Sequence, residues 1–98
     1  MTARYKFTTP AAEDLRGIIR YTRATWGVER ARHYREELEI ALQKLSLSPD
    51  VGRLRESIAP GVRSSRVASH IAFYVQRKDS ITILRLLHPH MDVDAAFG

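Results

Sequence analysis

The first half of the chain has one short alternating segment followed by apolar residues at helical spacing. Residues 4–8 alternate between apolar and polar positions and carry two aromatic side chains, which predicts a short strand. Thr9 and Pro10 follow as the expected N-cap and first helical residue, and Gly27 ends the expected helix. The apolar stripe of this helix consists of Leu15, Ile18, Ile19, Thr22 and Trp26.

A second helix is predicted from Val28 to about Ser46. Its apolar stripe consists of Ala31, Tyr34, Leu38, Ala41, Leu42 and Leu45. Because only Gly27 separates the two helices, we expect them to form an antiparallel hairpin. Turn-forming residues follow at 48–52, a polar connector at 53–57, and a second turn at Pro60-Gly61.

Three strands are predicted in the second half, over residues 62–69, 70–77 and 80–87. Lys78-Asp79 is expected to form a tight hairpin turn between the last two. The order β-α-α-β-β-β predicts a small α+β protein, with residues 1–98 as a single domain. The N-terminal strand and the helical hairpin are expected to pack on one face of a mainly antiparallel sheet.

The last two strands are apolar on both faces. Ile71, Phe73 and Val75 are expected opposite Ala72 and Tyr74, and Ile81, Ile83 and Leu87 opposite Leu84 and Leu86. Two helices cover one face of a sheet, so the second face would expose more apolar surface than a soluble monomer tolerates. A partner chain is the favoured cover, and a second copy of the chain or its own C-terminal tail are the alternatives.

Charge and composition narrow the class of partner. The chain has 16 Lys and Arg against 11 Asp and Glu, a formal net charge of +5, which favours an acidic partner such as nucleic acid or an acidic polypeptide. It has no cysteine, which excludes disulfides and thiolate chemistry. No apolar run approaches the roughly 20 residues that span a bilayer. We therefore expect a cytoplasmic protein without membrane contact.

Four histidines raise the question of a metal site: His33, His70, His88 and His90. His88 and His90 are two residues apart on an extended segment, which would place both rings on one side. No carboxylate pattern of a metalloenzyme accompanies them, so we expect neither a metal site nor a cofactor. Trp26 is interpreted first as a core anchor between the helices and second as an exposed contact residue, and Tyr34 has the same two interpretations.

RNA cleavage is the enzymatic alternative. It needs a base, an acid and cations around the phosphate in the transition state, and the conditional set is Arg66, Arg85 and His88. No arrangement of these three follows from the sequence, and basic side chains on a solvated face are the commoner outcome. We therefore predict that the protein is not an enzyme.

Five motifs together resemble a known family. They are Trp26-Gly27-Val28-Glu29-Arg30-Ala31 with Tyr34 and Leu38, Pro49-x-x-Gly52-Arg53, Pro60-Gly61-Val62-Arg63, Ser69-His70-Ile71-Ala72-Phe73-Tyr74, and Ile83-Leu84-Arg85-Leu86-Leu87-His88 with Met91-Asp92. In order and spacing, over about residues 4 to 94, they are similar to the ParE branch of the RelE/ParE toxin superfamily. Each motif alone is loose, and the combination is specific.

The resemblance implies the toxin of a type II toxin-antitoxin system, which traps DNA gyrase on cleaved DNA. It also implies neutralisation by a ParD-type antitoxin whose acidic, flexible C-terminal segment wraps the toxin. The RelE branch cleaves mRNA with arginines and a C-terminal Arg/Tyr, but here Ile71 and Met91 occupy the places of two such arginines and no tyrosine follows Tyr74. The resemblance therefore implies binding rather than cleavage.

Two sets of contact residues are predicted. For the antitoxin they are Ile19, Trp26, Tyr34, Leu38, Tyr74, Leu84 and Leu86. For gyrase they are Arg66, Arg85, His88, His90 and Met91. We expect a hetero-oligomer with the antitoxin and no direct binding of nucleic acid, and the alternatives are a RelE-like ribosome-dependent mRNA endonuclease and a non-toxic, basic nucleic-acid-binding module.

Overall fold

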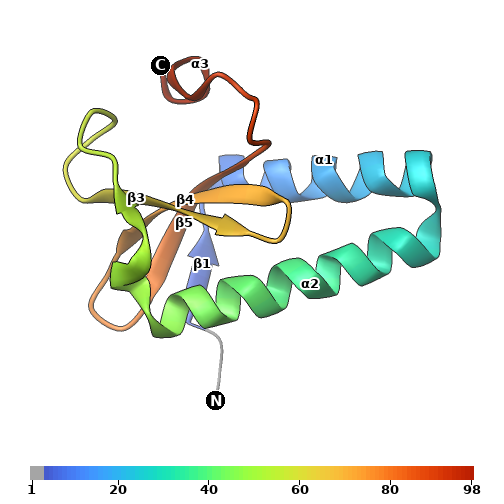
Figure 1. Ribbon diagram of the computed structural model, residues 1–98, viewed down its shortest axis with the longest axis horizontal. Coiled ribbons are helices and arrows are strands. Elements are labelled where there is room, and N and C mark those ends of the chain that lie inside the picture. The colour runs from blue at the N-terminus through green and yellow to red at the C-terminus, as the bar shows by residue number, and fades with distance from the viewer. Residues whose placement is uncertain (1–3) are drawn as a thin grey trace.

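The computed structural model describes residues 4–98 and opens with a strand and two long helices (Figure 1). Strand β1 (Tyr5–Phe7) leads into α1 (Thr9–Trp26), and α2 (Val28–Leu47) follows after one glycine. Gly27 has a φ of 100°, a conformation open to glycine because it has no Cβ, and its N–H closes α1 by donating to the Arg23 carbonyl. The predicted helical hairpin is thereby confirmed.

The N-cap of α1 is Thr8, one residue before the predicted Thr9. The Thr8 hydroxyl accepts the Ala11 N–H at 3.2 Å and donates to the Leu84 carbonyl at 2.9 Å. A capping hydroxyl that also bonds to the sheet fixes where the helix begins as well as satisfying its free N–H. That second bond depends on tertiary structure, which is why the sequence pointed to the neighbouring threonine.

Five strands form one sheet in the order β1-β5-β4-β3-β2. The strands that follow the hairpin are β2 (Arg53–Leu54), β3 (Val62–Val67), β4 (His70–Gln76) and β5 (Ile81–Leu87). β1 runs parallel to β5, and the other neighbours are antiparallel. The predicted α+β class and mainly antiparallel sheet are confirmed. The residues interpreted as a polar connector include the edge strand β2, which is too short to show an alternating pattern.

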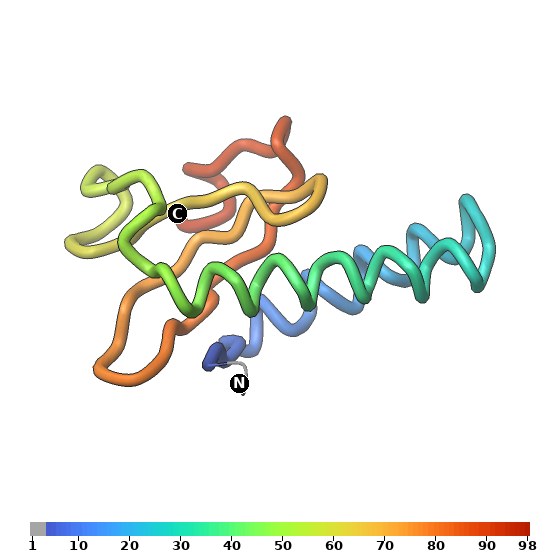
Figure 2. The backbone as a smooth tube through the Cα atoms, turned by 60° about the horizontal axis from the view of Figure 1, so that its bottom comes forward, coloured from blue at the N-terminus to red at the C-terminus, as the bar shows by residue number. Residues whose placement is uncertain are grey.

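The hairpin covers one face of the sheet, and the tube in Figure 2 shows its closed end extending beyond the sheet. The core cluster between hairpin and sheet consists of Ala11, Leu38, Leu42, Leu45, Val67, Ala72, Tyr74, Ile81, Ile83 and Leu86. Leu86 rather than Leu87 follows Ile81 and Ile83 into this core, contrary to the predicted alternation. The cause is a bulge: Phe73 pairs with Arg85 while Tyr74 pairs with Ile83, so Leu84 has no opposite residue.

The second face of the sheet is covered by the chain itself. A C-terminal helix, α3 (Val93–Phe97), places the Phe97 ring 5.3 Å from the ring of Phe73. The Arg55 guanidinium lies 5.3 Å from the same ring, and Phe73 and Leu87 are each only 1% exposed. The chain's own tail, one of the predicted alternatives, therefore covers this face around Phe73, and a partner on the rest of the face stays a prediction. No helix within residues 4–98 is long and apolar enough to cross a membrane.

Candidate partner-binding groove and basic surface

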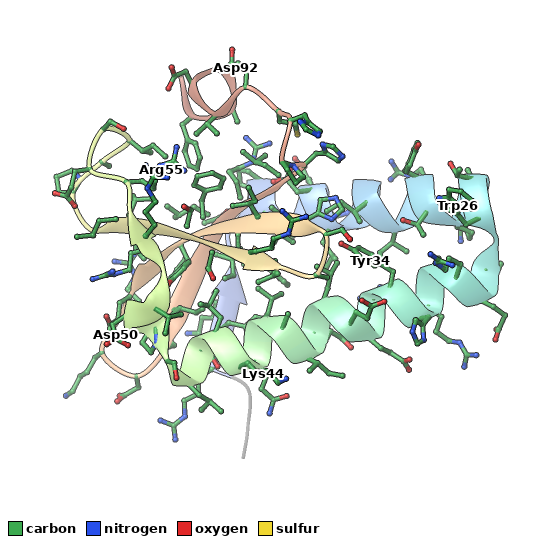
Figure 3. The ribbon with its side chains drawn as sticks, in the orientation of Figure 1. Trp26, Tyr34, Lys44, Asp50, Arg55 and Asp92 are labelled. Carbon is green, nitrogen blue, oxygen red and sulfur yellow. The ribbon has the colours of Figure 1, made fainter. Side chains whose placement is uncertain are left out.

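A groove of about 420 Å³ lies between the helical hairpin and the turn that joins β3 to β4. It is lined by Gly17, Ile18, Tyr21 and Thr22 of α1, by Trp26, Arg30 and Tyr34 around the hairpin junction, and by Ser69, His70 and His88 from the sheet. Figure 3 shows Tyr34 directed toward the sheet and Trp26 near the closed end of the hairpin. The lining combines apolar surface with three basic side chains and contains no carboxylate.

The floor of the groove is a hydrogen-bonded network between α2 and the β3–β4 turn. The Tyr34 hydroxyl oxygen accepts the Ser69 N–H at 2.9 Å and lies 2.6 Å from His70 Nδ1. With that oxygen engaged as an acceptor, its proton is available to Nδ1 of a neutral imidazole. Burial lowers the pKa of His70, and the nearby His88 and Arg66 lower it further. The free protein therefore holds His70 neutral near physiological pH.

The histidines continue outward from this floor along the C-terminal segment. The His70 and His88 ring centroids are 6.0 Å apart, and those of His88 and His90 are 5.2 Å apart. The His90 N–H donates to His88 Nδ1 at 3.2 Å. His88, His90 and Met91 are all exposed, with Met91 at 48%. The segment thus presents two imidazoles and a thioether to solvent beside the groove.

Trp26 is exposed rather than an anchor of the core. It is 67% exposed, and its ring lies 5.9 Å from the Arg30 guanidinium. The last turns of α1 extend past the sheet, so the sheet does not cover the indole there (Figure 1). The favoured prediction of a core anchor is wrong, and the alternative of an exposed contact residue fits. Tyr34 combines both roles, since its hydroxyl is bonded inside the protein while its ring lines the groove.

Arg85, predicted to contact gyrase, is bound within the protein. Its Nε and Nη2 donate to the two carboxylate oxygens of Asp14 at 2.7 and 2.9 Å, and its Nη1 donates to the Ala96 carbonyl at 2.8 Å. Asp14 also accepts the Leu86 N–H at 3.0 Å. The hydrogen bond with Asp14 raises the pKa of Arg85. We call this arrangement the Asp14–Arg85 clamp, and it joins α1, β5 and α3.

The clamp changes both the set of residues predicted to contact gyrase and the set predicted for RNA cleavage. It removes Arg85 from the surface proposed for gyrase, and it binds the guanidinium that the conditional catalytic set would use to Asp14 and Ala96. Arg66 remains exposed on β3, where it pairs with Ile71, and Ile71 pairs with Leu87 just before His88. Arg66 and His88 therefore lie at the same end of the sheet, with β4 between β3 and the end of β5. The clamp uses three of the five N–H donors of the Arg85 guanidinium and sets its charge against Asp14, which makes Arg85 a poor ligand for a phosphate.

Three of the residues predicted for the antitoxin are inside the core. Leu38, Tyr74 and Leu86 are 1%, 0% and 2% exposed. Tyr74 has a structural role, because its hydroxyl donates to the Pro49 carbonyl at 2.7 Å and accepts the Gly52 N–H at 3.0 Å. These three corrections share a cause. An apolar pattern identifies one face of a helix or strand, and at these positions that face packs in the core between the hairpin and the sheet. Ile19 and Leu84 are half-buried and accessible from outside.

Several residues that shape the site were not predicted. Arg30 and Tyr21 line the groove, Asp14 holds Arg85, and Arg55 and Phe97 cover Phe73. Helical spacing gave no signal for Arg30, because Gly27 ends α1 between Trp26 and Arg30. The others depend on contacts across the fold. Among residues 4–98, no group of three or more His, Cys, Asp or Glu is arranged to hold a metal ion.

Fold and site together define a small α+β protein with exposed basic side chains and a groove beside its helical hairpin. The sequence model of the family described as "ParE toxin of type II toxin-antitoxin system, parDE" matches residues 5–93. The chain belongs to this family of ParE toxins. The match ends where α3 begins.

Relatives and a solved structure agree with that assignment. The chain is 37% identical over 95 residues to Toxin ParE1 of Mycobacterium tuberculosis, covering 96% of this chain and 97% of the relative. It is 35% identical over 94 residues to Toxin ParE of Escherichia coli, covering 95% and 90%. A chain of the chromosomal ParDE TA system from P. aeruginosa matches with a TM-score of 0.72 and 26% identity, covering 87% of this chain and 94% of that one.

Proposed function

We propose that this toxin acts in the cytoplasm by binding DNA gyrase and trapping it on cleaved DNA, and that a ParD-type antitoxin neutralises it. Membership of the ParE toxin family supports the toxin role. The observation that favours binding over RNA cleavage is the Asp14–Arg85 clamp, because it engages one of the two arginines of the conditional catalytic set. Action by binding requires an accessible surface, and the structure offers two.

The surface proposed for gyrase consists of Arg66, His88, His90 and Met91. All four side chains are exposed, and the strand pairings place Arg66 and His88 at one end of the sheet. The formal charge of +5 favours an acidic target surface or the neighbourhood of bound DNA. Arg85 is no longer part of this proposal, since its guanidinium is bound within the fold.

The surface proposed for the antitoxin consists of Ile19, Trp26, Tyr34 and Leu84. Trp26 and Tyr34 line the groove, which suits the docking of an amphipathic helix or an extended segment. His88 belongs both to the groove and to the surface proposed for gyrase. An antitoxin that fills the groove would therefore cover part of the target surface, and this overlap provides a physical route to neutralisation.

Induced expression in cells tests the proposal. Growth, supercoiling of a reporter plasmid and integrity of a reporter mRNA would be followed together, with and without a co-expressed ParD-type antitoxin. We expect growth arrest, lost supercoiling or trapped gyrase–DNA cleavage, intact mRNA, and rescue by the antitoxin. Arrest accompanied by cut mRNA would instead establish an endonuclease of the RelE kind.

A paired substitution separates the two surfaces. Arg66→Ala with His90→Ala is expected to abolish toxicity and leave antitoxin binding within about threefold, because neither side chain lines the groove. The matched control is Arg77→Ala with His33→Ala, which removes one exposed arginine and one exposed histidine elsewhere on the molecule. Full toxicity in the Arg66/His90 variant would refute this location of the target surface.

A further inference from the structure

We propose that the groove takes an apolar side chain flanked by a carboxylate from the antitoxin's acidic segment, with uptake of a proton by His70. This inference rests on the proposed function and specifies the chemistry of the partner at this site.

The space suits one large apolar side chain. The groove measures about 420 Å³ and its walls include Ile18, Tyr21 and Trp26, the last two being 68% and 67% exposed. Gly17 leaves a gap in the α1 wall, and a Cβ built on it would meet no atom within 4 Å. Exposed aromatic walls around a recess of this size are typical of the anchor sites that dominate protein interfaces.

The charge suits a carboxylate beside that side chain. Arg30, His70 and His88 are the basic groups of the lining, and no Asp or Glu is among its ten residues. Within residues 4–98 Arg30 forms no ion pair, whereas Arg32 on the same helix is paired with Glu29 at 2.6 Å. The guanidinium of Arg30 lies over the Trp26 ring, so a carboxylate bound there would adjoin the apolar wall. The lining is too apolar for a nucleic-acid backbone, which is a chain of charges.

Proton uptake on binding is expected from the groups that surround His70. The Tyr34 hydroxyl contacts it from α2, and Arg66 from β3 and His88 from the C-terminal segment lower its pKa, with His90 beyond His88. The lining of the groove adds Arg30 from α2 and Tyr21 from α1. All of these are neutral or positive near pH 7, and together with burial they keep the imidazole neutral. A bound carboxylate would be the first negative charge in the set, and it favours the protonated ring. Complex formation would therefore take up a proton and tighten as the pH falls.

The test uses the ParD-type antitoxin that rescues growth in the expression experiment, titrated calorimetrically into the toxin. Buffers of different ionisation enthalpy report the protons taken up. We expect net uptake in the wild type near pH 7, reduced uptake in His88→Gln, and unchanged uptake in His33→Gln, whose exposed ring lies near Glu37 outside the groove. Zero uptake by the wild type, or loss of uptake in His33→Gln alone, would overturn the proposal.

A groove-filling variant provides the steric test without harming the fold. Gly17→Leu places a side chain into the open space of the groove and replaces glycine by a good helix former, so thermal stability should be unchanged or higher. Antitoxin affinity should nevertheless fall by at least about tenfold, as for loss of a hot spot. Unchanged affinity contradicts the proposal, as does displacement of the antitoxin by a short DNA duplex. If the wild type binds no ParD-type antitoxin at any pH, the proposed function itself fails.

Discussion

Replacing Asp14 by alanine should destabilise the fold more than any other single loss of charge on the helical hairpin. The change removes two hydrogen bonds from Arg85 and one from the Leu86 N–H, and it leaves the Arg85 guanidinium without its counter-charge. The two side chains are 16% and 22% exposed, so the pair is neither fully buried nor freely solvated. Loss of one partner of such a pair costs less than the 3–5 kcal/mol of a fully buried ion pair, and we expect about 2–3 kcal/mol.

Urea unfolding followed by far-UV circular dichroism measures this loss. Against a total stability of roughly 5–15 kcal/mol, a loss of about 2–3 kcal/mol lowers the transition midpoint clearly while leaving the slope unchanged. In a domain of this size the melting temperature should fall by about 8–24 °C. Trp26 fluorescence is a poorer probe, because the indole is already exposed in the folded state.

Two further measurements test whether the loss of stability comes from the Asp14–Arg85 contact. Arg35→Ala breaks an exposed pair with Glu39 on α2 and should cost no more than about 0.5 kcal/mol. A double-mutant cycle of Asp14→Ala with Arg85→Ala should give a coupling free energy of about 2 kcal/mol, within the range for residues in one hydrogen-bonded network. A cost below about 1 kcal/mol for Asp14→Ala, equal to that of an exposed pair, would refute the reasoning that the clamp joins three elements.

Three further predictions concern packing and pH. Gly52→Ala would drive a Cβ into the buried Tyr74 hydroxyl and should lower the free energy of unfolding by about 2 kcal/mol or more. Gly17→Ala, with open space around it, should raise that free energy by up to about 1 kcal/mol. Urea midpoints compare the two variants, and equal effects would contradict the packing. Phe97→Ala uncovers Phe73 and should cost about 1–3 kcal/mol by the same assay, and no loss would mean that α3 does not protect this face. The folded-state pKa of His70 is lowered, so the unfolded chain binds more protons and stability should fall as the pH drops below about 6.5. His70→Gln should flatten that decline, and an unchanged pH profile would count against the cause assigned to it.

The architecture could be predicted because the spacing of apolar residues along the chain indicates each helix and the three longer strands. Apolar stripes of helical spacing located α1 and α2, one glycine placed the hairpin junction, and alternation located β3, β4 and β5 within two residues of their observed ends. These features depend on residues close in the sequence. The family likeness added the functional class, because its five motifs span nearly the whole chain.

The features that could not be predicted depend on contacts distant in sequence. Asp14 and Arg85 are 71 residues apart, and nothing local indicates that they meet. The bulge opposite Phe73 and Tyr74 reversed the facing of the last residues of β5, which no alternation pattern could show. Trp26 lies on the apolar stripe of α1, but its exposure depends on where the sheet beneath the hairpin ends.

The candidate site was predicted in its residue types more than in its geometry. Trp26, Tyr34 and His88 were named, and the structure brings all three to one groove. The network that joins Tyr34 to His70 was not foreseen, since it bridges a helix and a strand turn 36 residues apart. Core positions such as Leu38 were assigned to a surface because a stripe alone does not tell an inward face from an outward one.

The most direct test of the central claim is gyrase activity in vitro with the purified toxin. Relaxed plasmid, ATP and gyrase would be incubated with increasing toxin, with and without the antitoxin, and both supercoiling and cleaved linear DNA would be measured. We expect lost supercoiling with accumulation of gyrase-bound cleaved DNA, both reversed by the antitoxin. Gyrase that is unaffected by a folded toxin which still arrests growth would contradict it.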